Sequence, residues 1–146
     1  MNRIRILIVD DHEIFRRGLR SLLESRPEFQ ILGEAADGMQ AIEKAKELKP
    51  ELIVMDVSMP QLDGLQATRL IRKQLPSTKI LILSQHDTSH MLSAAFEAGA
   101  NGYVTKSQVS RCLLAALDAI AAGRPFTWNG QETEAAAQNS TGTDTN

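Results

Sequence analysis

The sequence is poor in cysteine and in aromatic residues. Its 146 residues include one cysteine, Cys112, and aromatic residues make up only 4% of the chain. A single cysteine excludes both an internal disulfide and a metal cluster held by several cysteines. Such low cysteine usage is typical of a protein from a reducing compartment.

The chain also lacks a long hydrophobic run and an excess of positive charge. No stretch approaches the roughly 20 apolar residues that span a bilayer. The N-terminal MNRIRILIVDDHE reaches its carboxylates too early for a signal peptide. A net charge of -2 argues against a surface built mainly for nucleic acid or anionic lipid. We therefore expect a cytoplasmic protein that binds neither membrane nor, as this chain alone, DNA.

What is present is the composition of one soluble domain with a core, at 42% hydrophobic and 23% charged residues. Apolar runs predict five strands, at residues 4–10, 29–35, 52–56, 79–84 and 101–106. Between them, and after the last, apolar residues recur at helical spacing. Strict alternation of strand and helix predicts an α/β fold with a parallel sheet covered by helices on both faces.

The end of the chain has a different composition. The segment QETEAAAQNSTGTDTN has no lysine or arginine, and its only apolar residues are alanines. Such a segment buries too little surface to offset the entropy of ordering it. We expect one domain over residues 1–125 and a disordered tail or linker remnant over residues 126–146.

Polar residues stand where the predicted strands end. They are Asp10 and Asp11, Asp56, Ser84 and Lys106. Ligands of open parallel sheets bind at the carboxyl ends of the strands, so these residues meet if their strands are neighbours. Clustered carboxylates repel one another unless a cation lies among them, and an all-oxygen site suits Mg²⁺ or Mn²⁺. A hydroxyl and an ammonium beside that ion would match phosphoryl oxygens, which predicts a site for aspartyl-phosphate formation.

Four stretches together resemble the receiver domain of two-component response regulators: DD after the first strand, MDVSMPQLDG, LSQH and GANGYVTK. The likeness covers about residues 3–123, and ILIVDDHEIFRRGLRSLLE, GEAADG and EAGANGYVTKS are most similar to the NarL/FixJ, or LuxR-type, branch. The resemblance implies a flavodoxin-like, doubly wound (βα)5 fold with five parallel strands in the order 2-1-3-4-5. It also implies a DNA-binding helix-turn-helix module after the receiver, which these 146 residues do not contain.

The resemblance implies roles for the residues of the site. Asp56 accepts a phosphoryl group from the phosphohistidine of a sensor histidine kinase or a phosphotransfer protein. Asp11, Asp56 and the backbone carbonyl of Ser58 bind Mg²⁺ directly, and Asp10 reaches it through water. Lys106 pairs with a phosphoryl oxygen.

Further positions implied by the family concern switching and lifetime. Ser84 hydrogen-bonds the phosphoryl group and Tyr103 is the aromatic switch residue. Ser58 and His86 tune dephosphorylation. Many receivers have a cis proline after the lysine; this chain has Ser107 there, so we expect a trans bond because a cis non-proline bond costs roughly 2.5–4 kcal/mol.

Other interpretations of these residues stay open at this point. Asp10 and Asp11 could favour a helix N-terminus, and Tyr103 could simply pack. His12, His86 and His90 fit solvated side chains better than ligands. A nucleotide binder would need a glycine-rich loop where DDHE stands, and a haloacid-dehalogenase-like phosphatase would need an aspartate where Ser58 stands.

Within the resemblance, the family implies a signalling domain and not an enzyme, since it catalyses only its own phosphorylation and dephosphorylation. Its output would be transcription through a DNA-binding module; a stand-alone receiver acting as a phosphorelay or protein-binding module is the alternative. Pairing of two copies would use the first and fifth helices, or the face made by the fourth helix, fifth strand and fifth helix.

Overall fold

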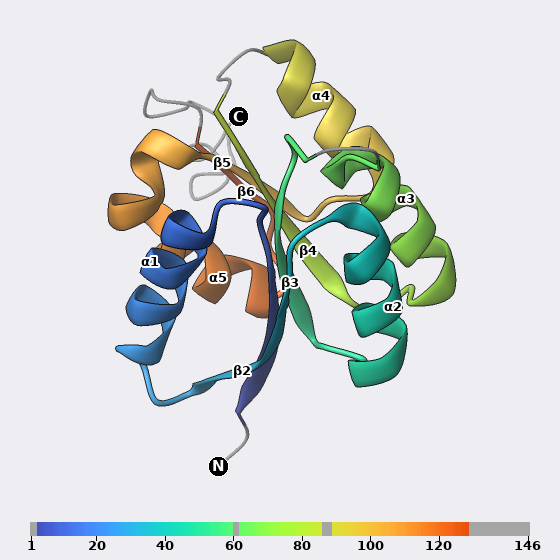
Figure 1. Cartoon of the computed structure of the whole chain (residues 1–146). Helices are drawn as coiled ribbons and strands as arrows, with labels where there is room; N and C mark the ends of the chain where they lie inside the picture. Colours follow the sequence, from blue (N-terminus) through green and yellow to red (C-terminus); the bar gives the residue numbers. More distant parts are fainter. Residues whose placement is uncertain (1–2, 60–61, 86–88, 129–146) are drawn as a thin grey trace.

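The computed structural model describes residues 3–59, 62–85 and 89–128 (Figure 1). Its elements follow one another as β1 (Ile4–Val9), α1 (Glu13–Glu24), β2 (Phe29–Ala35), α2 (Gly38–Leu48), β3 (Leu52–Asp56), α3 (Gly64–Gln74), β4 (Lys79–Ser84), α4 (Ser89–Ala98), β5 (Gly102–Thr105), the short 3₁₀ helix η1 (Lys106–Gln108), α5 (Val109–Ala121) and β6 (Phe126–Trp128). The five predicted strands are therefore confirmed to within a residue at each end.

The strands form one sheet in the order β2-β1-β3-β4-β5-β6, and every neighbouring pair is parallel. The predicted order 2-1-3-4-5 and the flavodoxin-like α/β fold are confirmed. Because β3 lies between β1 and β4, both of its edges are paired and its five residues are all buried. This explains why LIVMD is an unbroken apolar run up to its final aspartate.

The prediction of five strands was wrong by one, because β6 adds a sixth at the edge of β5. Residues 126–128, expected to belong to the tail, pair with β5; Gly102 lies opposite Phe126 and Tyr103 opposite Thr127. Phe126 packs against the core. Three residues are too few to show an alternating pattern, so only the side-chain types favour a strand here. Residues 129–146 lie outside the described part, and the predicted tail stays a prediction there.

The sheet separates two hydrophobic cores (Figure 1). On one face, α1 and α5 cover alternate strand residues such as Ile8, Val54 and Leu83. On the other face, α2, α3 and α4 cover their sequence neighbours, among them Val9, Met55 and Ile82. Burial on both faces follows from the parallel topology, in which each crossover helix packs back onto the sheet.

One irregularity in β2 changes which way its later side chains point. Ile6 pairs with Ile31, but Leu7 pairs with Gly33, so Leu32 is an extra residue in β2. Side chains alternate between the faces of a strand, and one extra residue reverses that alternation beyond the bulge. Glu34, the register partner of Ile8, consequently lies on the α1 face.

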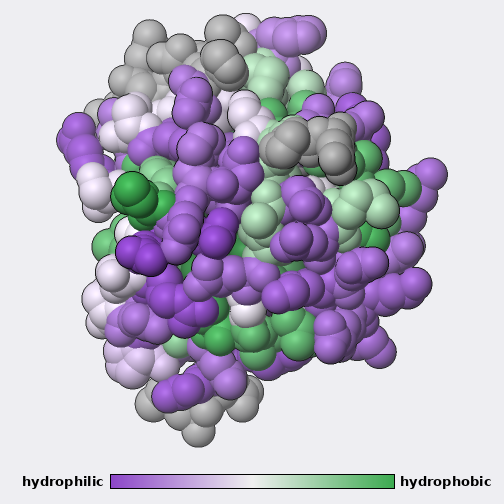
Figure 2. All heavy atoms as spheres, in the orientation of Figure 1, coloured by the Kyte–Doolittle hydropathy of each residue, from purple (hydrophilic) through white to green (hydrophobic). Residues whose placement is uncertain are grey.

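Among the described residues, no helix is both long and apolar enough to cross a bilayer. Figure 2 shows a mainly hydrophilic surface in this view, on which hydrophobic residues form separate patches.

Two glycines allow a matched test of how closely α3 packs on the end of β3. A Cβ on Gly64 would lie 2.1 Å from the main-chain oxygen of Asp56, whereas a Cβ on Gly18, within α1, would meet nothing within 4 Å. We expect Gly64→Ala to lower the free energy of unfolding by about 1–3 kcal/mol, as overpacking does. Gly18→Ala should raise it by about 0.5–1 kcal/mol. Urea unfolding of both variants measures this, and equal effects would contradict the packing described here.

Candidate functional site

The predicted site residues meet at the carboxyl ends of neighbouring strands, the upper end of the sheet in Figure 1. Asp10 follows β1, Asp56 ends β3, Ser84 ends β4 and Lys106 follows β5. The strand order makes all four strands adjacent. The expectation that these residues share one edge of the sheet is thus confirmed.

A buried ion-pair cluster forms the centre of the site. The carboxylates of Asp10 and Asp56 are both 0% exposed, and the side chain of Lys106 is 11% exposed. Lys106 Nζ lies 3.0 Å from Asp10 Oδ2 and 3.3 Å from Asp56 Oδ2. One ammonium therefore faces two buried carboxylates, and this cluster has one more negative than positive charge when all three groups are ionised.

The surroundings of Asp56 make its ionised form costly. Burial raises the pKa of this carboxyl most, and the charge of Asp10 raises it further; Lys106 and the Ser58 N–H lower it, with the result that it lies at about 6. The Ser58 N–H donates to Asp56 Oδ1 over 3.2 Å. A group whose pKa is shifted by burial and a named charge partner is a frequent mark of a functional site.

The cluster has the properties of a cation site. Within the described ranges, Asp10 Oδ2, Asp11 Oδ1 and Asp56 Oδ2 are buried and accept no hydrogen bond, although Lys106 lies within ion-pair distance of two of them. Ligand atoms of Asp10, Asp11, His12 and Asp56 all lie within 4.8 Å of one another. Carboxylate charges that outnumber the positive charges beside them fit a bound metal ion, which would supply the missing positive charge. The residues present therefore fit such an ion.

His12 lies beside the acids of this cluster, although the sequence favours a solvated side chain at this position over a ligand. Its main-chain N–H donates to Asp10 Oδ1 over 2.7 Å. Its ring nitrogen Nδ1 lies 3.2 Å from that oxygen and 3.1 Å from Asp11 Oδ1. The side chain is half exposed, as expected for a solvated histidine, yet the turn after β1 brings one nitrogen back to the acids.

Ser84 and Tyr103 lie on the neighbouring strands β4 and β5. Ser84 is buried and pairs in register with Thr105. Tyr103 is fully buried in the core under α2, α3 and α4, so its ring points inward in this structure. The Lys106–Ser107 peptide bond is trans, as expected.

Two predicted tuning positions have different outcomes. Ser58 is exposed next to Asp56, and its main chain contacts the carboxylate. His86 lies outside the described residues.

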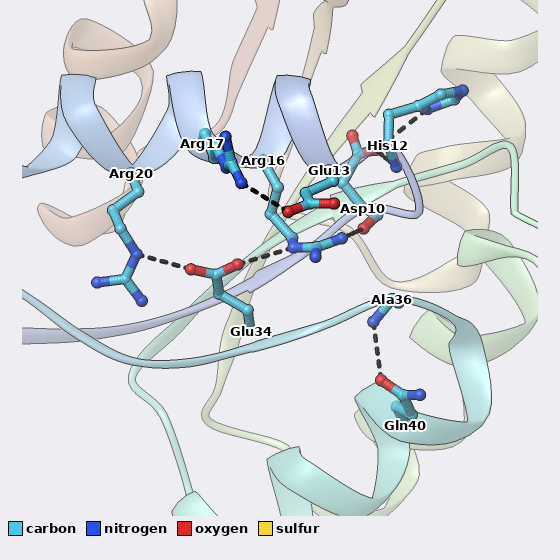
Figure 3. A network of polar contacts seen from close by, with 9 residues as sticks. All are labelled: Asp10, His12, Glu13, Arg16, Arg17, Arg20, Glu34, Ala36 and Gln40. Carbon is cyan, nitrogen blue, oxygen red and sulfur yellow. Dashed lines mark hydrogen bonds and ion pairs between the residues drawn. The ribbon is translucent and has the colours of Figure 1, made fainter.

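Residues of α1 support the site from one side, and sequence reasoning did not single them out. The Phe15 ring lies under Lys106, with Nζ 4.5 Å from its centroid, a cation–π arrangement. Arg16 donates to the main-chain oxygen of Asp10 and also binds Glu34, which Arg20 contacts from its other side (Figure 3). The only sign of this contact in the sequence is that Arg16 and Arg20 stand four residues apart in a predicted helix, while Glu34 is a single charged residue in a predicted strand.

Comparison with protein families and solved structures gives a consistent result. Residues 6–118 match the response regulator receiver domain. The transcriptional regulatory protein DegU of Brevibacillus brevis is 36% identical over 125 residues, which are 86% of this chain and 53% of that protein. LnrK of Bacillus subtilis is 40% identical over 82% of this chain and 54% of that protein. The chain thus spans about half the length of these curated relatives.

Among solved structures, a LuxR-family two-component response regulator from Aurantimonas sp. is similar with a TM-score of 0.85 and 40% identity, over 95% of this chain and 99% of that one. The isolated receiver domain of RcsB from Salmonella enterica, solved with the phosphomimetic BeF₃⁻, has a TM-score of 0.81 and 29% identity, over 93% of this chain and 97% of that one.

The raised pKa of Asp56 predicts a pH-dependent stability difference. Because folding raises this pKa from 3.8 to about 6, ionisation of Asp56 destabilises the fold as pH rises through that window. Without metal, Asp56→Asn should be more stable than the parent above pH 6, by an amount on the order of 2–3 kcal/mol. The advantage should shrink towards pH 4. Denaturant unfolding in EDTA measures this, and an advantage independent of pH would contradict the assignment.

Proposed function

Because this chain belongs to the family of response regulator receiver domains of two-component signalling, we propose that Asp56 is its phosphoacceptor. The observation that carries this proposal is the buried Asp56 carboxylate, 3.3 Å from the Lys106 ammonium and beside two further aspartates. Phosphoryl transfer depends mainly on positioning and charge neutralisation, which these residues can provide. In the reaction, an oxygen of Asp56 bonds to phosphorus while the bond from phosphorus to a kinase histidine breaks.

We assign the acidic cluster as a site for Mg²⁺, with Mn²⁺ as a substitute. Asp11, Asp56 and the backbone carbonyl of Ser58 would bind the ion directly, and Asp10 through water. All four donors are oxygens, the ligands that Mg²⁺ prefers. The ion would neutralise charge on the phosphoryl oxygens during transfer.

The remaining roles belong to the phosphorylated state. Lys106 would leave its pairing with the carboxylates and bind a phosphoryl oxygen, and Ser84 would donate its hydroxyl to another. Tyr103 lies on the strand next to that of Ser84. Its side chain would move when Ser84 moves, and this would change the surface near α4 and β5. Ser58 and His86 would set the rate of dephosphorylation. The chemistry is limited to the domain's own phosphorylation and dephosphorylation.

The relatives support a transcriptional output, since DegU and LnrK are named as transcriptional regulatory proteins. In this proposal the receiver controls a DNA-binding module beyond the present 146 residues, and these residues themselves do not bind DNA. The partners would be a histidine kinase or phosphotransfer protein and a second copy, through α1 and α5 or through α4, β5 and α5. A stand-alone phosphorelay module remains the alternative.

The phosphoacceptor can be tested by mass spectrometry after incubation with acetyl phosphate and Mg²⁺. The parent should gain about 80 Da, the mass of one phosphoryl group. Asp56→Asn and EDTA should both abolish the gain. Asp63→Asn is the matched control because Asp63 caps α3, and asparagine caps a helix equally well. Labelling of Asp56→Asn at the parent's level would remove Asp56 from its role.

The metal can be tested by thermal unfolding with and without Mg²⁺. A ligand that binds only the folded state stabilises it by about 1.4 kcal/mol at a free concentration ten times its Kd. Mg²⁺ should therefore raise the Tm of the parent and raise it much less in Asp11→Asn. A parent Tm that ignores millimolar Mg²⁺ would contradict the metal assignment.

A further inference from the structure

We propose that Arg16, held in place by Glu34, is a positioning residue that fixes the acidic turn after β1 and thereby sets the affinity of the site for its divalent cation. This inference rests on the proposed function, because it concerns the same metal site. Neither residue contacts the phosphoacceptor in the described structure. Their action would be through the main chain of Asp10.

The bulge at Leu32 creates this arrangement. Without the extra residue, the alternation of β2 would place Glu34 on the face covered by α2. With it, Gly33 faces Leu48 of α2, and Glu34 faces α1. Bulges near functional sites commonly re-aim a side chain in this way.

Glu34 joins two arginines of α1 (Figure 3). Its Oε1 accepts from Arg16 Nε over 2.7 Å, and its Oε2 accepts from Arg20 Nε over 2.6 Å. Partial burial opposes ionisation of Glu34, but the hydrogen bonds from Arg20 and Arg16 outweigh it and lower the pKa. Glu34 is thus a charged anchor that holds the Arg16 guanidinium by one edge.

The other edge of Arg16 reaches the site. Its Nη1 donates to the main-chain oxygen of Asp10 over 2.5 Å, and its side chain is only 18% exposed. The Asp10 N–H donates to the oxygen of Ala35, the residue after Glu34. The N–H of Asp10 is therefore bound directly to β2. Its carbonyl oxygen is bound to Arg16, which is itself bound to Glu34 of β2.

Fixing the main chain of Asp10 also fixes its carboxylate. Asp10 Oδ1 accepts the His12 N–H, which leaves Oδ2 directed towards Lys106 and the cluster. Divalent ions require their oxygen ligands at defined positions, and residues that orient ligands typically change metal affinity 10–100-fold when replaced. A free Asp10 carbonyl would let the turn of Asp10 and Asp11 adopt other conformations.

The test is Mg²⁺ titration calorimetry of the full 146-residue chain at a temperature where each protein is fully folded. Arg16→Met keeps the length and apolar stem of the side chain but removes both contacts, and we expect roughly tenfold weaker binding. The lysine of Arg16→Lys has a single side-chain nitrogen and cannot bridge Glu34 and the Asp10 carbonyl at the same time. Its Mg²⁺ affinity should therefore lie between those of the parent and of Arg16→Met. Glu34→Gln keeps Arg16 but weakens its anchor, and should also weaken binding.

Arg17→Met is the matched control, since Arg17 is the next residue of α1 and pairs with Glu13 in an exposed i,i+4 contact. It should bind Mg²⁺ as the parent does. If the folded Arg16 and Glu34 variants all bind like the parent, the positioning role is overturned while the proposed function stands. If the parent itself binds no Mg²⁺, the proposed metal site fails first, and this inference fails with it.

Discussion

The interaction around which the candidate site is organised is the contact of one ammonium, Lys106, with two buried carboxylates, Asp10 and Asp56. Burial of ionised carboxylates costs free energy unless each charge is compensated. Here one cation serves two acids, and the third, Asp11, lies within reach of them. Burial first, and then the charge of Asp10, raises the pKa of Asp56 to about 6. The fold therefore holds acids close together with too little positive charge beside them, and a bound cation would supply the missing charge.

The sheet topology is what makes such an arrangement tolerable. Because β3 is central, Asp56 is delivered to the edge of the sheet by a strand that is hydrogen-bonded on both sides and packed on both faces. Val57, directly after β3, donates its N–H to the Leu83 oxygen and accepts the N–H of Gly64, the first residue of α3. Side chains held by rigid strands stay close together even when their charges repel, whereas side chains on flexible loops could move apart. In the proposed function, the same strands would transmit a change at Asp56 to Ser84 and Tyr103.

Much of this could be predicted from sequence, for physical reasons that also define the limit. A strand that is buried on both faces is apolar along most of its length, so LIVMD and KILILS could be predicted as buried strands. The polar residue at the end of each strand predicts the edge of the sheet where a ligand binds. The sixth strand could not be predicted, because Phe126–Trp128 has only three residues and depends on the free edge of β5. The contact of Phe15 with Lys106 was not predicted, and His12, expected to be a solvated side chain, also contacts the acids. Both contacts depend on the direction in which the chain runs from the turn after β1 into α1, and no local sequence pattern predicts that direction.

The bulge in β2 shows most clearly why the support of a site is harder to predict than its centre. FQILGEA alternates poorly, and in sequence nothing distinguishes Leu32 from its neighbours as the extra residue. Yet that one residue decides whether Glu34 meets α2 or the arginines of α1. The aspartates of the site can be recognised in the sequence because binding a cation requires carboxylates, and the fold requires them at the carboxyl ends of strands. Arg16 and Glu34 act through geometry, and their role becomes visible only when register, bulge and helix position are known together.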